Sequence, residues 1–342
     1  MKLVAGTRGS ELAITQTELV CKSLIAAFPG LEIEKKIIKT KGDKILDKAL
    51  DKIGDKGIFV KEIERQLIDG KIDFAVHSLK DMPSEIDARL KLVNTPMRAD
   101  ARDVLIVNPK HNIDSKDAMK WLKSSNGLRV GTGSKRRIAQ LLMINKSINP
   151  IPLRGNIATR ISKLESEDMD AIVLAAAGIE RLDIKNINVY YFDYDQMIPA
   201  SGQGALAIEI KKNNTELEKI FESISDRKTE LEVAAERSFL KKINGGCHIP
   251  VGSISFIEND LFVIRGIFGN EDYTNIVVKD KKLDLSSICS CSEKELKCHF
   301  IENLESDVSK SSVLKALSSL GSSLAEEIIY EFNKKEIKVN SR

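Results

Sequence analysis

Short apolar runs alternate with longer amphipathic stretches along roughly the first 200 residues of the chain. The runs at residues 74–76 and 171–174 are too short for helices and predict buried strands. Residues 11–28 repeat their apolar positions with the helical period and stop at Pro29-Gly30, which predicts a helix. Strands that alternate with helices are typical of α/β domains with largely parallel strands. The same pattern predicts strands at 3–5, 33–38, 104–107 and 128–131, and helices at 60–68, 134–145 and 156–165.

The pattern changes after about residue 225, where a predicted helix is followed by alternating apolar and polar positions. Residues 280–292 are rich in Lys, Asp and Ser and predict a loop insertion. A further amphipathic helix closes the chain, so this part is expected to form a small α+β C-terminal domain. Its helices are predicted at 229–243 and 313–333, and its strands at 253–257, 261–266 and 275–279.

Two glycine-rich turns with similar neighbours divide the earlier part of the chain. Gly-Thr-Arg-Gly-Ser at 6–10 and Gly-Thr-Gly-Ser at 131–134 each follow a predicted strand and precede a predicted helix. A Ser or Thr at such a turn can cap the helix, and the free N–H groups there favour an anion. Polar segments at 97–103 and 199–204 suit two crossings between similar α/β lobes that face a cleft and share a hinge. We expect lobe 1 at 1–99 with 199–222, lobe 2 at 100–198, and the C-terminal domain at 223–342.

Charge and composition exclude several classes of protein. The chain has 53 basic and 50 acidic residues, and its net charge of +3 is too small to argue for nucleic acid or a membrane as partner. Aromatic residues make up only 5% of the chain, which weakens a nucleic-acid interpretation further. No apolar run is as long as a membrane span, and no secretory leader precedes the first predicted strand. We expect a soluble globular protein in which any anion binding is local.

The five cysteines are an odd number, which argues against a disulfide framework and for a reducing compartment. Cys289, Cys291, Cys298 and His299 gather four potential zinc ligands. Their spacing lacks the usual pair of cysteines two residues apart, so we expect a variable surface loop and no metal site. Cys247 differs, because two glycines precede it and leave its thiol uncrowded on a turn. A lone cysteine is most often a small buried hydrophobe, so other residues must decide its role.

Arginine is concentrated at the predicted turns between strands and helices. Open α/β sheets bind ligands at the carboxyl ends of their strands, and a guanidinium grips a carboxylate or phosphate with two parallel hydrogen bonds. Any one of these arginines could equally form a surface ion pair, but the set indicates an oligo-anionic ligand. Its members are Arg8, Arg136, Arg137, Arg154, Arg160 and Arg181.

An acidic residue follows the predicted strand at 74–76, in the run His-Ser-Leu-Lys-Asp-Met-Pro. Lys80 and Asp81 could be an ordinary solvated pair. Within a cleft of arginines, Asp81 would instead be the carboxylate available to stabilise a developing cation. His77 is expected to be packed or hydrogen-bonded rather than to act as a base.

Six motifs, taken together, resemble those of the porphobilinogen deaminases, also called hydroxymethylbilane synthases. The resemblance implies two periplasmic-binding-protein-like lobes with a small C-terminal domain. It also implies a transferase of tetrapyrrole and haem biosynthesis that condenses four porphobilinogen molecules head to tail, releases ammonia, and frees linear hydroxymethylbilane by hydrolysis. The motifs lie at 6–10, 77–83, 131–137, 153–160, 199–204 and 245–247, in the family's order.

The resemblance also implies roles for particular residues. Cys247 would carry a dipyrromethane cofactor through a thioether, as a primer built from the substrate itself. Asp81 would stabilise the cationic species formed when ammonia leaves porphobilinogen. The cofactor would further be bound by Lys80, Ser134, Arg136, Arg137 and Arg160, and the substrate by Arg8, Ser10, Gln16, Arg154, Arg160, Arg181 and Gln203.

One alternative remains open from the sequence. Two hinged α/β lobes around a cleft are also the design of bacterial solute-binding proteins, which would bind a carboxylated ligand without catalysis. That class needs an export signal, which is absent here, and has no use for an exposed cysteine in a third domain. We expect a monomer in the cytoplasm, although a plastid form without its transit peptide would look the same.

Overall fold

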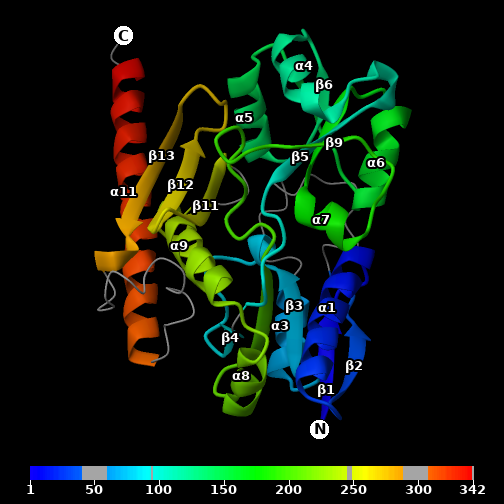
Figure 1. The fold of residues 1–342 in the computed structure, drawn as a ribbon, viewed down its shortest axis with the longest axis vertical. Helices are drawn as coiled ribbons and strands as arrows, with labels where there is room; N and C mark the ends of the chain where they lie inside the picture. Colours follow the sequence, from blue (N-terminus) through cyan, green and yellow to red (C-terminus); the bar gives the residue numbers. More distant parts are fainter. Residues whose placement is uncertain (41–59, 94, 245–248, 288–306, 341–342) are drawn as a thin grey trace.

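The computed structural model describes residues 1–40, 60–93, 95–244, 249–287 and 307–340 of the 342-residue chain. Its strands form three sheets, each accompanied by helices (Figure 1). Two of these sheets have five strands and lie one above the other along the longest axis. The third has three strands and lies beside the upper one.

The first sheet has the strand order β2-β1-β3-β10-β4. β1 runs parallel to β2 and β3, whereas β10 runs antiparallel to β3 and β4. Apolar side chains of α1 (Glu11–Ala27) and α8 (Thr215–Glu222) pack on one face, and those of α3 (Lys61–Ile68) on the other. The strands are β1 (Lys2–Thr7), β2 (Glu32–Ile37), β3 (Phe74–Ser78), β4 (Leu90–Val93) and β10 (Leu206–Lys211).

The second sheet repeats this plan with the order β7-β6-β8-β5-β9. β6 is parallel to β7 and β8, and β5 is antiparallel to β8 and β9. Helices α4 and α5 cover one face, and α6 and α7 the other. The strands are β5 (Asp103–Val107), β6 (Arg129–Gly131), β7 (Asn149–Ile151), β8 (Ala171–Ala175) and β9 (Val189–Tyr191), and the helices are α4 (Ala118–Ser124), α5 (Lys135–Ile144), α6 (Ile157–Ser166) and α7 (Ala176–Arg181).

The matching strand orders confirm two similar α/β lobes, but the expectation of largely parallel strands is wrong. Each sheet contains two antiparallel pairings, because β5 and β10 are the strands that enter each sheet after a crossing. The chain passes from the first sheet to the second between β4 and β5, and returns between β9 and β10. Both predicted crossings are therefore confirmed.

The C-terminal part combines an antiparallel sheet, β11-β12-β13, with two helices. Apolar side chains of α9 and α11 pack together and against this sheet, which confirms the α+β expectation. Residues 280–284 belong to β13, so the predicted loop begins too early. Asp280 pairs there with Arg265 of the neighbouring strand. The elements are α9 (Arg227–Ile243), β11 (Val251–Glu258), β12 (Leu261–Gly269), β13 (Ile276–Asp284) and α11 (Asp307–Asn340).

A buried carboxylate ties both crossings to the C-terminal part. Glu236 of α9 is fully buried and accepts hydrogen bonds from both terminal nitrogens of Arg98, at 2.7 and 3.0 Å. Arg98 belongs to the first crossing. The N–H of Gly202 in the second crossing donates to Glu236 at 2.6 Å, and that of Ser255 in β11 at 2.9 Å. Glu236 therefore joins the segments on which any lobe movement would turn.

No helix in the described part of the chain has the length and apolar character that crossing a membrane requires.

Candidate active site

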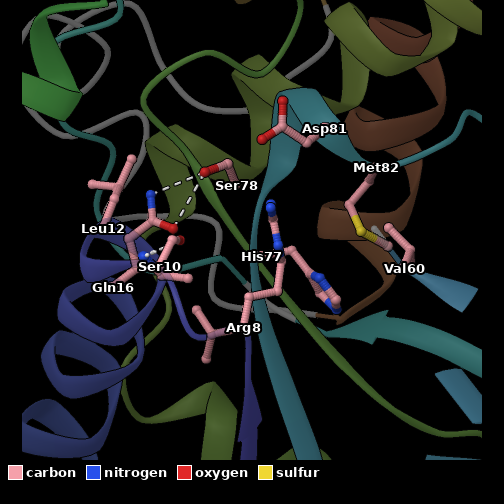
Figure 2. Close-up of a pocket in the computed structure, with 11 residues that line it drawn as sticks. Arg8, Ser10, Leu12, Gln16, Val60, His77, Ser78, Asp81 and Met82 are labelled. Carbon is pink, nitrogen blue, oxygen red and sulfur yellow. Dashed lines mark hydrogen bonds between the residues drawn. The ribbon is translucent and has the colours of Figure 1, made fainter. Parts of the chain in front are cut away.

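The carboxyl ends of β1 and β3 open into a pocket on lobe 1 (Figure 2). Arg8 follows β1, and Asp81 ends the short 3-10 helix η2 (Leu79–Asp81) that follows β3. The structure therefore brings together four of the residues singled out from the sequence. The pocket is lined by Arg8, Ser10, Leu12, Ala13, Gln16, Val60, Val76, His77, Ser78, Asp81 and Met82.

The start of α1 supplies the polar wall of this pocket. Ser10 is the N-cap of α1, and its hydroxyl accepts a hydrogen bond from the N–H of Ala13 at 3.4 Å. Gln16, one turn later, is buried and donates from Nε2 to the hydroxyl of Ser78 at 2.9 Å. Figure 2 shows this bond between α1 and the end of β3. Ser10 thus caps its helix as expected, and Gln16 holds the strand end that leads to Asp81.

Asp81 and Lys80 lie next to each other but in different surroundings. Asp81 is exposed, whereas Lys80 is partly buried and donates to Oε1 of Gln203 at 3.3 Å. Burial lowers the pKa of Lys80 to about 8, although the carboxylate of Asp81 acts in the opposite direction. A ligand carboxylate beside this amine would stabilise its charged ammonium form.

His77 is packed and hydrogen-bonded against a neighbouring strand. Its Nε2 lies 3.1 Å from a carboxylate oxygen of Glu209 on β10, and both side chains are buried. The structure thus supports the expectation of a packed, hydrogen-bonded histidine.

A second group of site residues lies at the start of α5, in lobe 2. Ser134 caps α5, because its hydroxyl accepts from the N–H of Arg137 at 3.5 Å. Arg136 and Arg137 are both buried and both contact Asp103, the first residue of β5. Arg136 donates to Asp103 at 2.5 Å and to the carbonyl of Ile198 at 2.7 Å. These two arginines are therefore anchored inside the protein by a carboxylate that the motifs did not include.

Asp103 is the functional candidate that sequence reasoning missed. Burial would raise its pKa, but the charges of Arg136 and Arg137, with their hydrogen bonds and that of Gln203, outweigh this effect and hold the pKa well below its usual value. Gln203 donates from Nε2 to Asp103 at 3.0 Å. The available signal was an acidic residue that opens a strongly apolar strand directly after a predicted crossing.

Two further arginines lie in helices of lobe 2, Arg160 in α6 and Arg181 at the end of α7. Arg160 donates from Nε to the carbonyl of Gly155 at 2.8 Å, and Arg181 donates to the carbonyl of Gly204 at 2.6 Å. Burial lowers the pKa of both, that of Arg181 to about 10. The charge of Asp81 opposes this shift at Arg160, so the lobe 1 carboxylate and this lobe 2 cation interact. Arg154 follows β7 near Arg160.

Neither Arg160 nor Arg181 forms an ion pair within the described part of the chain. Both side chains are half-buried, and a guanidinium group carries five N–H donors, so these two positions suit a ligand that brings its own carboxylates. This donor set fits the acetate and propionate groups of a dipyrromethane and of porphobilinogen.

Several expectations fall on residues that are not described. Cys247 lies outside the described residues, as do Cys289, Cys291, Cys298 and His299. The elements around Cys247 are those expected, since α9 ends at Ile243 and β11 begins at Val251. Within the described ranges, no group of three His, Cys, Asp or Glu side chains could hold a metal ion.

Solved structures with some likeness to this chain include an amino-acid ABC transporter extracellular-binding protein, ytmK, from Bacillus subtilis. It is 14% identical, with a TM-score of 0.41 over 65% of this chain and 90% of that one. The second substrate binding domain of a putative amino acid ABC transporter from Streptococcus pneumoniae is 17% identical, with a TM-score of 0.40 over 66% and 92%. The matching strand orders of the two five-stranded sheets are what establish the two-lobed architecture.

Family models and relatives are far more specific. The model "Porphobilinogen deaminase, dipyromethane cofactor binding domain" matches residues 3–219, and "Porphobilinogen deaminase, C-terminal domain" matches 230–293. A porphobilinogen deaminase of Clostridium novyi is 48% identical over 82% of this chain and 92% of its own length. One of Clostridioides difficile is 48% identical over 84% and 93%. The chain belongs to the porphobilinogen deaminase family.

Proposed function

We propose that the pocket of lobe 1 and the arginines of lobe 2 together form the active site of this porphobilinogen deaminase. The enzyme is a transferase of tetrapyrrole biosynthesis. It condenses four porphobilinogen molecules head to tail, with loss of ammonia, onto a dipyrromethane primer, and it releases hydroxymethylbilane by hydrolysis. The observation that carries the proposal is the pocket at the carboxyl ends of β1 and β3, which gathers Arg8, Ser10, Gln16 and Asp81.

The donor set described above fits the dipyrromethane cofactor of this family. Its attachment point is proposed to be the thiol of Cys247, through a thioether. When bound, the cofactor supplies a free pyrrole α-carbon as the nucleophile. Its carboxylates require cations, because several negative charges gather in one cleft. The residues proposed to hold them are Lys80, Ser134, Arg136, Arg137 and Arg160.

Substrate binding is proposed to use cations and amides from both lobes. Arg160 and Arg181 are bonded to backbone carbonyls and can add a ligand carboxylate to those contacts. Gln16 and Ser10 form the polar wall of the pocket in lobe 1. The proposed set is Arg8, Ser10, Gln16, Arg154, Arg160, Arg181 and Gln203.

Asp81 is proposed as the catalytic carboxylate. Loss of ammonia from porphobilinogen creates positive charge on the substrate pyrrole. A preorganised carboxylate beside that charge lowers the barrier, while the arginines keep the substrate carboxylates fixed. The side chain is exposed and so is accessible to a substrate in the pocket.

Replacing this carboxylate by its amide tests the assignment. Asp81→Asn should load cofactor almost normally and lower kcat at least about a hundredfold, because electrostatic stabilisation of this kind contributes that much. The measurement is turnover of porphobilinogen alongside intact mass. Asp87→Asn is the matched control, since Asp87 pairs with Arg89 in an exposed loop and should keep full activity. Near-normal turnover of Asp81→Asn would remove this residue from the mechanism.

Three further features belong to the proposal. The lobes are taken as 1–99 with 199–222 and 100–198, followed by a third domain at 223–342, which agrees with the membership of the three sheets. The small net charge supports the absence of a nucleic-acid partner. We place the enzyme in the cytoplasm as a monomer. The relatives reported above are bacterial, so the plastid form considered from sequence receives no support.

A further inference from the structure

Asp103 sits where the two lobes and the second crossing meet. It is fully buried at the start of β5, directly after the first crossing. Its Oδ2 accepts from Arg136 at 2.5 Å, and its Oδ1 accepts from Nε of Arg137 at 3.0 Å. The same Oδ1 forms an ion pair with Nη2 of Arg137, at 2.8 Å. Gln203 of the second crossing donates a further N–H to the carboxylate at 3.0 Å. One carboxylate thus receives donors from α5 and from the hinge.

The charges of this cluster do not balance without a ligand. Two buried guanidinium groups face one buried carboxylate, so a positive charge is left over. Lys80 adds another positive charge through Gln203. Burial lowers the pKa of Arg137, because a buried environment disfavours the charged form, and the charge of Asp103 opposes that effect. Without Asp103 the cations would repel one another. With Asp103 the cluster keeps an excess of positive charge, which ligand carboxylates can neutralise.

Asp103 also decides which way the amide of Gln203 points. An ionised carboxylate can only accept hydrogen bonds, so it must face the Nε2 of Gln203. A second acceptor, the carbonyl of Ala101, lies 2.8 Å from the same nitrogen. The amide oxygen is therefore left for the ammonium group of Lys80, at 3.3 Å. An amide at position 103 would add a donor that lets the Gln203 side chain turn over and present its NH2 group to Lys80.

The contacts of Arg136 fix the position of its side chain as well as neutralising its charge. A Cβ added at Gly252 of β11 would lie 2.6 Å from Cδ of Arg136, so the arginine stem packs against the third domain. Its guanidinium is held at the far end by Asp103 and by the carbonyl of Ile198. The side chain thus has little freedom to reorient when a ligand arrives.

We propose that Asp103 is a positioning residue for tetrapyrrole assembly. It holds Arg136 and Arg137 in place for the carboxylates of the cofactor and fixes the Gln203 amide so that its oxygen faces Lys80. The proposal rests on the proposed function, because it assigns Asp103 a role only through residues placed in that site.

Asp103→Asn tests this role with three readouts on the full-length protein. We expect the fraction carrying the cofactor, measured by intact mass, to fall, and KM for porphobilinogen to rise about tenfold through weakened charge-assisted contacts. The pH at which Lys80 becomes reactive to an amine-labelling reagent should also move down, since the Asp103 charge favours the ammonium form. Asp100→Asn is the matched control. Asp100 lies three residues before Asp103 and forms an ion pair with half-exposed Arg102.

The proposal is overturned if Asp103→Asn matches wild type in cofactor fraction, in KM and in Lys80 labelling. If that variant does not fold, Asp103→Glu decides. It keeps the charge but moves the carboxylate by one methylene, so impaired loading with a raised KM supports positioning, and wild-type values contradict it. Wild-type protein without a cofactor adduct would instead count against the proposed function. The labelling of Lys80 needs no cofactor and would still decide the role of Asp103.

Discussion

Lys80 combines a positive charge with a partly buried position beside the catalytic candidate. Its ordinary pKa of 10.5 falls to about 8, chiefly through burial, and a group with that value changes its charge close to physiological pH. The ammonium form is the one that binds a carboxylate. The free enzyme should therefore lose affinity for its anionic substrate as the pH rises through about 8.

The pH dependence of kcat/KM tests this ionisation. Wild type should show a falling limb near pH 8, and Lys80→Gln should lose that limb and be about tenfold less active below it. Arg181 titrates only near 10 and cannot account for such a limb. Lys91→Gln is the control, since Lys91 pairs with Glu218 on lobe 1 and should keep the wild-type profile. A falling limb that persists in Lys80→Gln would contradict the assignment.

Most residues of the candidate site could be proposed from the sequence because each lies in a short motif at or near a strand end. The structure brings Arg8, Ser10, Gln16 and Asp81 to one pocket, as the order of strand, turn and helix required. The sequence offers only a weak signal for Asp103, an acidic residue that opens an apolar strand, because its proposed role depends on contacts with residues 33 and 100 positions later in the chain. Hydrophobic periodicity carries no information on such partners.

At the scale of elements, the close packing of α9 against α11 depends on a glycine. A Cβ added at Gly321 of α11 would lie 2.1 Å from the backbone carbonyl oxygen of Ala235 in α9. A backbone atom in the middle of a helix cannot move aside as a flexible side chain can. The two helices are therefore held at a distance that only glycine permits at this position.

Gly321→Ala should destabilise the protein by about 1–3 kcal/mol, as overpacking in a core does, in spite of the better helix propensity of alanine. Chemical denaturation measures the change in the free energy of unfolding. The matched control is Ser319→Ala, which places the same residue on the exposed face of α11 and should change stability by no more than about 0.5 kcal/mol. Equal stability of the two variants would show that the helices separate easily.

Several elements that sequence analysis missed have separate physical reasons. β7 and β9 have three residues each, too few for a period to show. β10 carries Glu209 in its middle. A glutamate in a strand predicts a solvent-exposed position, but Glu209 is buried against His77. The antiparallel direction of β5 and β10 follows from the crossings, and pairing direction is not encoded in the local pattern of a strand.

At the scale of the whole molecule, Glu236 links both crossings to the third domain. Its two carboxylate oxygens accept hydrogen bonds from Arg98, Gly202 and Ser255. Glu236 is fully buried, so water cannot easily replace it as the acceptor for these donors. The third domain, which carries Cys247, is therefore joined mechanically to the segments between the lobes. Movement of the lobes and placement of the primer are expected to be coupled through this residue.

Glu236→Gln should lower the free energy of unfolding by about 3–5 kcal/mol. Buried Arg98 then loses its shorter ion pair and keeps the longer one with Glu232, at 3.4 Å, and the new NH2 group faces other N–H donors. The control is Glu326→Gln, which removes an exposed pair with Lys242 and should cost no more than about 1 kcal/mol. Urea unfolding followed by circular dichroism compares the variants. An effect of Glu236→Gln as small as that of the control would show that the crossings are secured elsewhere.

The central claim is that the protein permanently carries a two-pyrrole primer on Cys247 and builds its product on it. Intact mass spectrometry of the purified protein tests this claim most directly. We expect a mass above that of the sequence by one dipyrromethane, further steps of one pyrrole unit each after brief exposure to porphobilinogen, and no adduct on Cys247→Ala. A wild-type protein at its sequence mass, or an adduct that survives in Cys247→Ala, would contradict the account.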